Sequence, residues 1–143
     1  MKTTLKPGLT HRIAYTVTER TTVPSTYPDS PVIASMPKVF ATGFMVMLME
    51  RACTEFLALH LDPGEGSVGV HIDVSHVAAT PVGMTVTVDA ECAEIVDRRI
   101  AFNVKAHDGV DLIGEGRHER FVVIWDKFNA RVAAKAAKLE RVA

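Results

Sequence analysis

The spacing of hydrophobic positions changes along the chain, and each spacing predicts a different element. Residues 39–61 are apolar around most of a helical circumference, which predicts a helix enclosed by other structure. Four later runs are typical of strands because apolar and polar residues alternate along them. Their approximate ranges are 67–79, 84–96, 99–107 and 111–124. A looser alternation over residues 9–18 predicts one further strand before the helix.

Proline, glycine and charge mark the segments between and after these elements. Four prolines between residues 23 and 38 prevent a long regular element, so residues from about 20 to 38 are predicted to form a loop or lid. Residues from about 126 to 143 are rich in alanine, lysine and arginine, which predicts a solvated surface helix. A phosphate-binding role for that helix is the less favoured interpretation.

The connections between the last four strands are short and carry turn residues. Thr80–Gly83, Asp97–Arg98 and Asp108–Gly109 leave no room for crossover helices, so we predict an antiparallel meander. A curved antiparallel sheet wrapped around one long helix is an α+β arrangement, the layout of the hot-dog fold. Such a sheet keeps open edges and an apolar seam, and we therefore expect a homodimer.

Composition restricts the class of protein. With 143 residues and 48% hydrophobic content, the chain suits a single domain, 1–143, with a core of its own. A net charge of −1 argues against nucleic acid and anionic membranes as partners. No apolar run spans a bilayer and no signal-peptide pattern opens the chain, so a cytoplasmic location is predicted. Cys53 and Cys92 are interpreted as free buried thiols.

The predicted helix carries one carboxylate, Glu50, on a largely apolar side. An ionised carboxylate in such a place needs a hydrogen-bonded partner, or its pKa rises toward the range of acid/base chemistry. A catalytic acid or base and a structural Glu bound to a backbone donor or to a cation such as Arg51 are equally compatible with the helix alone. Thr42 lies two turns earlier and is either a groove residue or an ordinary first-turn or helix-capping Thr.

The strand after the helix supplies an imidazole. Strict alternation puts His76 in the core-facing row with Val68 and Val70, and Gly69 on the opposite face. A lone His in an apolar row is more often structural than catalytic, but helix and sheet must converge. Glu50 and His76 are therefore predicted neighbours, within one subunit or across a dimer.

Other signals on the strands are weaker. Gly64–Gly69 satisfies G-x-G-x-x-G, but it lies between a helix and a strand, so a dinucleotide site is rejected. Gly69 either marks a bulge or leaves room for a ligand near its N–H group. His71 and Asp73 lack a third ligand, so no metal and no other cofactor are predicted. In the last strand His118 and Arg120 share one face, and that pair or the pair on the other face is interfacial.

Several runs together resemble the fluoroacetyl-CoA thioesterase family, and the resemblance spans nearly the whole chain. The runs are residues 39–46, 48–50, 62–67, 76–81, 106–111, 118–120 and 127–130. The resemblance implies a homodimeric hot-dog enzyme that hydrolyses an acyl-CoA thioester to free acid and CoA. It also implies catalytic roles for Thr42, Glu50 and His76. Implied substrate contacts are Val23, Gly69 and Arg120.

The lid departs from the family pattern. Family members place phenylalanines where this chain has Ile33 and Met36, and flexible aliphatic chains change both pocket shape and water exclusion. The alternatives are a general short-chain acyl-CoA thioesterase without fluorine selectivity, a hot-dog dehydratase or hydratase, and a non-catalytic acyl-CoA-binding protein. For a hydrolase, Glu50 either attacks the thioester or activates water, while His76 moves protons.

Overall fold

The computed structural model describes the backbone of residues 1–142 and side chains through Leu139. The strands are β1 (Thr10–Thr16), β2 (Glu65–Val74), β3 (Thr85–Val96), β4 (Arg99–His107) and β5 (Leu112–Ile124). The helices are η1 (Glu19–Thr21), α1 (Val23–Thr26), α2 (Pro31–Ala34), α3 (Thr42–Ala58) and α4 (Trp125–Val142). The predicted elements are therefore present, and the predicted end of the last helix at residue 143 lies outside the described residues.

The five strands form one antiparallel sheet in the order β1-β3-β4-β5-β2. The predicted four-strand meander is wrong in one respect, because β2 pairs with β5 and not with β3. After β2 the chain follows β5 through bonds from Ser75 N to Glu115 O and from Val77 N to Ile113 O. It then crosses the end of the sheet to β3. Thr80–Gly83 lie at the end of this connection. Their residue types also suit the turn of a hairpin, so the sequence does not separate the two cases.

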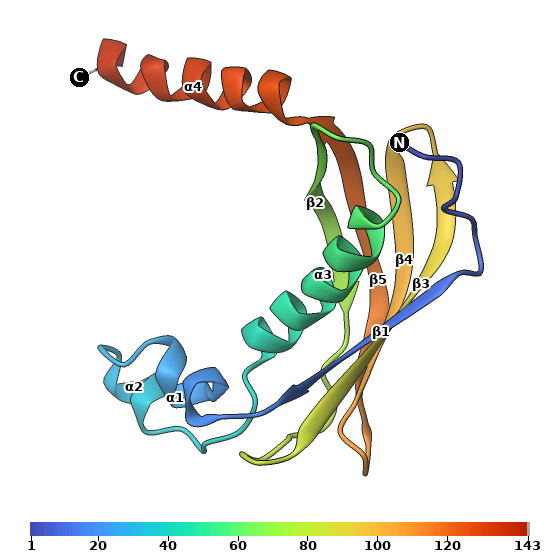
Figure 1. Cartoon of the computed structure of the whole chain (residues 1–143). Helices are drawn as coiled ribbons and strands as arrows, with labels where there is room; N and C mark the ends of the chain where they lie inside the picture. Colours follow the sequence, from blue (N-terminus) through green and yellow to red (C-terminus); the bar gives the residue numbers. More distant parts are fainter. Residues whose placement is uncertain (143) are drawn as a thin grey trace.

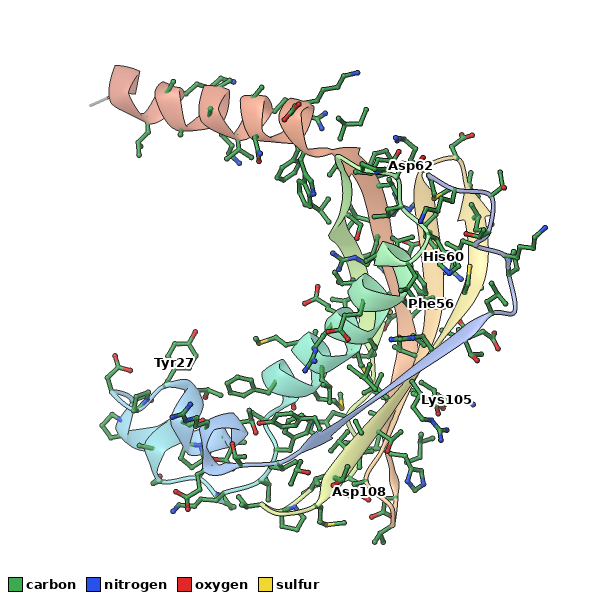
Figure 2. The ribbon with its side chains drawn as sticks, in the orientation of Figure 1. Tyr27, Phe56, His60, Asp62, Lys105 and Asp108 are labelled. Carbon is green, nitrogen blue, oxygen red and sulfur yellow. The ribbon has the colours of Figure 1, made fainter. Side chains whose placement is uncertain are left out.

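The sheet curls around α3, which lies along its concave side (Figure 1). One side of α3 is buried against the sheet: Met45, Leu48, Met49, Ala52, Cys53, Phe56 and Leu57. Phe56 points from α3 into this layer (Figure 2), where its ring centroid lies 5.8 Å from that of Phe102. The opposite side is open, with Met47 57% exposed. The helix is therefore covered by its own sheet on one side only, in contrast to the predicted full enclosure.

A β-bulge changes the alternation of β2. The register with β5 shifts between Gly69 and His71, so Val70 is an extra residue without a direct partner. One extra residue moves every later side chain to the other face. Gly69 before the bulge and His76 after it therefore both face α3, whereas strict alternation predicted opposite faces. Val70 is not in the core-facing row but is 44% exposed.

Two segments project from the body at opposite ends of the curve (Figure 1). Near the start of α3, the segment predicted to be a loop or lid contains two four-residue helices, α1 and α2, each with a proline in its first turn. At the other end α4 extends away from β5, with all side chains from Arg131 to Leu139 exposed. Among the described residues, no helix combines the length and hydrophobicity needed to cross a membrane.

Candidate active site

Thr42 and His76 form a hydrogen-bonded pair where α3 begins. Ala41 occupies the N-cap position and its side chain makes no capping bond, so Thr42 is the first helical residue. The Thr42 hydroxyl lies 2.7 Å from His76 Nδ1. His76 lies two residues beyond β2, and the backbone bonds of its neighbours Ser75 and Val77 to β5 hold it there. Of the alternatives to a groove residue, a capping Thr is excluded, whereas Thr42 is indeed a first-turn residue.

The other nitrogen of His76 is free. Within the described residues, Nε2 is buried and has no hydrogen-bond partner. Burial lowers the pKa of His76, and the nearby backbone carbonyl of Ala78, an acceptor for the charged ring, offsets part of this effect. The ring is therefore neutral near neutral pH, and one of its nitrogens can exchange a proton with a bound molecule.

A cavity of about 330 Å³ opens beside this pair. Val23 of the lid contributes to its wall together with Thr42 and His76. The remaining lining residues are apolar: Val39, Phe40, Val77, Ala78 and Ala79. A polar pair in an apolar wall is the usual composition of a small-molecule site.

Glu50 belongs to a second group of polar side chains. It lies eight residues after Thr42, or about 12 Å along the helix axis, and is partly buried. A Cβ atom at Gly69 would be 3.0 Å from Glu50 Oε1 and 3.6 Å from Arg120 Nη1. The absence of a side chain at Gly69 therefore leaves open the space between a carboxylate, a guanidinium and the backbone of the bulge.

Arg120 is held firmly within this group. It is 7% exposed, its Nε donates to Ser67 Oγ at 2.8 Å, and its Nη2 donates to the Ser67 carbonyl at 3.0 Å. Burial lowers the pKa of Arg120, and the nearby Glu50 carboxylate raises it. A guanidinium keeps its charge under these conditions. The group thus combines a fixed positive charge with a carboxylate.

Cys53 lies next to the same charges but is not a nucleophile. Burial raises the pKa of its thiol to about 12, with a smaller opposing effect from Arg120. The thiolate is the reactive form of cysteine, so this side chain is inert at neutral pH.

Most of the predicted site residues fall into these two groups. Thr42, His76 and Val23 lie together, and so do Glu50, Gly69 and Arg120. Glu50 and His76 are in different groups, so the predicted contact between them is not formed within one chain. In the lid, Ile33 is partly buried and Met36 is 44% exposed.

Sequence reasoning did not assign roles to Ser67 and His118, which both bind Arg120. His118 is 1% exposed and Arg120 is 7% exposed, so of the two pairs in β5 this one lies in the interior of the chain's own fold. The sequence signal available was that His118 and Arg120 share one face of a strand whose later residues are apolar.

The model of the fluoroacetyl-CoA-specific thioesterase family matches residues 17–126. The chain belongs to this family. It is similar to a fluoroacetyl-CoA thioesterase of Streptantibioticus cattleyicolor, with 51% identity over 135 residues that cover 94% of this chain and 97% of that protein. Membership of this thioesterase family confirms the predicted thioester hydrolase.

Two solved structures are similar to this chain in fold. A variant of the fluoroacetyl-CoA-specific thioesterase, in complex with fluoroacetate and CoA, has 51% identity and a TM-score of 0.84 over 87% of this chain and 99% of that one. A hot-dog-like protein from Thermanaerovibrio acidaminovorans has 26% identity and a TM-score of 0.79 over 90% of this chain and 91% of that one. The predicted hot-dog fold is confirmed.

Proposed function

We propose that this member of the family hydrolyses fluoroacetyl-CoA to fluoroacetate and CoA. The observation that carries the proposal is the convergence of Glu50, Gly69 and Arg120 on one open space. A similar protein is a fluoroacetyl-CoA thioesterase at 51% identity, and a similar solved structure contains both products, fluoroacetate and CoA. A carboxylate, a backbone donor and a fixed cation are the groups that acyl transfer through an oxyanion requires.

In the proposed complex the thioester carbonyl lies at Gly69. The developing oxyanion is stabilised by the N–H groups of the bulge and by the charge of Arg120, which is already held by Ser67 and needs no reorganisation. Val23 contacts the substrate from the lid, where it lines the cavity beside Thr42.

Glu50 acts on the thioester carbon by one of two routes. In the first, a carboxylate oxygen attacks the carbon, CoA leaves as the thiolate, and water then cleaves the mixed anhydride. In the second, Glu50 takes a proton from a water molecule that attacks the carbon directly. In both routes His76 moves protons, and the hydroxyl of Thr42 orients its ring through the bond to Nδ1.

A homodimer is part of the proposal, because one protomer separates Glu50 from His76. The edge strand β2 exposes Val70 and Ile72, at 44% and 40%, and the open side of α3 exposes Met47. A second copy lying in the concavity of Figure 1 would cover these apolar side chains and bring its own groups next to those of the first. A cytoplasmic location and a lack of nucleic-acid and membrane partners stay predictions.

The lid favours a second candidate function, general hydrolysis of short acyl-CoA thioesters. Ile33 and Met36 are flexible aliphatic side chains, and Met36 is 44% exposed. Exclusion of water and a rigid pocket shape are the means by which a lid separates close analogues, and these side chains supply less of both.

The test is release of free thiol from fluoroacetyl-CoA and acetyl-CoA by the wild type, Glu50→Gln and Glu55→Gln. Glu55 is a matched control, because it lies on the exposed side of the same helix and pairs with Arg51. Turnover of the fluorinated substrate that is lost only in Glu50→Gln supports the proposal. Equal turnover of both thioesters supports the general enzyme instead. Turnover of neither substrate contradicts both.

A further inference from the structure

His118 lies between the two parts of the site that the proposed function assigns to the substrate carbonyl. Its Nδ1 is 2.8 Å from the carbonyl oxygen of His71, the residue that follows the bulge in β2. Its Nε2 is 3.2 Å from Arg120 Nη1. Its Cε1 would be 3.2 Å from a Cβ atom at Gly69. One ring therefore contacts the bulge and the guanidinium at the same time.

The two partners determine the state of the ring. A backbone carbonyl only accepts hydrogen bonds, so Nδ1 must carry the proton. A guanidinium only donates, so Nε2 must be the unprotonated acceptor. His118 is thus a neutral imidazole in the Nδ1–H tautomer, and a proton on Nε2 would break the bond to Arg120.

The surroundings of the ring maintain this state. His118 is almost completely buried, and burial is the main cause of its lowered pKa. The charge of Arg120 lowers it further, while the bond to His71 and the carboxylates of Glu50 and Glu119 act in the opposite direction. A cationic ring here would place two positive charges in contact inside the protein.

The guanidinium of Arg120 has two anchors. Ser67 holds Nε and Nη2, whereas Nη1, the nitrogen nearest to Gly69, is bound to His118. We propose that His118 is a positioning residue whose neutral ring fixes Nη1 of Arg120 beside the Gly69 bulge. The inference rests on the proposed function, because that function gives Arg120 and the bulge their role toward the substrate.

The test compares two polar substitutions of similar size. His118→Gln keeps an acceptor near the position of Nε2, while His118→Asn keeps a donor near Nδ1 and loses the acceptor. We expect kcat/KM for fluoroacetyl-CoA to fall about 100-fold in His118→Asn and less than about tenfold in His118→Gln, since a misplacement of about 1 Å has effects of that size. If the loss of kcat/KM in the two variants simply parallels their loss of melting temperature, whichever variant is more active, the proposal would be overturned.

A double-mutant cycle asks whether the effect passes through Arg120. In the Arg120→Ala background, His118→Asn should lower kcat/KM by less than about twofold, because the bond that it removes no longer exists. A full additional loss in that background would mean that His118 acts by another route and would overturn the proposal.

Ring nitrogen chemical shifts give a readout that does not depend on activity. In protein labelled with nitrogen-15 histidine, the His118 signals, identified by their absence in His118→Gln, should show a protonated Nδ1 and an unprotonated Nε2, and Arg120→Ala should shift Nε2. The opposite tautomer would overturn the proposal. If the wild type hydrolyses neither thioester, the proposed function fails, and these shifts then decide the His118–Arg120 bond alone.

Discussion

Replacing Gly69 with Ala should separate activity from stability. The added Cβ atom would lie 3.0 Å from Glu50 Oε1, about 0.4 Å short of the 3.4 Å at which ordinary contact begins. The Glu50 carboxylate is only partly buried and can move by that amount. The buried His118 ring, whose Cε1 would be 3.2 Å from the same Cβ atom, must also shift slightly. The methyl group then occupies the space proposed for the thioester carbonyl.

The expected loss is large for one methyl group. Displacement of the carboxylate and of the carbonyl from the N–H groups of the bulge should lower kcat/KM about 100-fold, or about 2.7 kcal/mol in transition-state free energy. Gly69 is not among the residues with positive φ. Ala is therefore tolerated by the backbone, and its gain of up to about 1 kcal/mol through the unfolded state is offset in part by the contact with the buried His118 ring.

The assay measures thiol release and the melting temperature on the same preparation. Gly43→Ala is the matched control, because a Cβ atom there has no neighbour within 4 Å. It should change kcat/KM by less than about twofold while gaining up to about 1 kcal/mol from helix propensity. Activity of Gly69→Ala within about threefold of the wild type would refute the role given to this space, since a lost oxyanion donor alone costs about 100-fold or more.

Three further outcomes follow from buried groups. Cys53 and Cys92 are both fully buried, so a thiol reagent should find no reactive cysteine in the native protein and two after denaturation; reaction of the native protein would contradict their placement. Asp108 accepts from the backbone N–H groups of residues 110 and 111 and from Thr80, so Asp108→Asn should lower the free energy of unfolding by about 2 kcal/mol in denaturant titration, and an unchanged midpoint would argue against these bonds. Burial lowers the pKa of His76 and of His118 in the folded protein. As the pH falls below about 6.5, the histidines of the unfolded chain are therefore protonated first. The stability that the neutral rings contribute is present above that pH and is lost as the pH falls toward their pKa values in the folded protein. Melting temperatures between about pH 7.5 and 5.5 should therefore fall toward acid, less steeply in His118→Gln, and a flat profile in the wild type would contradict the shifts.

The elements could be predicted because their patterns are local. The apolar run that gives α3 and the alternation that gives the strands both lie within a few turns or residues of sequence. The place of β2 beside β5 could not, because strand order depends on contacts between distant segments, and the turn at Thr80–Gly83 fits both a hairpin and the end of a crossing.

The site could be predicted in part for the same reason. Glu50 stood out because a carboxylate in an apolar helix is unusual. His76 stood out as an imidazole in the core-facing row of a strand. The core-facing position of His76 was predicted correctly. The face of Gly69 was wrong, because a strand glycine indicates that a bulge can occur but not that the extra residue is Val70. His118 was passed over because its importance lies in two hydrogen bonds, to His71 and Arg120, that no spacing rule describes.

The bulge at Val70 has a consequence for how this chain can change in length. Gly69 of β2 and Arg120 of β5 are direct partners in the strand register. An insertion or deletion in only one of these two strands would shift the register and separate them. Deleting Val70 would turn His76 away from Thr42 without altering a single chemical group. We therefore expect length variation among descendants of this sequence to fall in the loop at residues 59–64 and in the turns at 97–98 and 108–111, while the residue count from Gly69 to His76 stays constant.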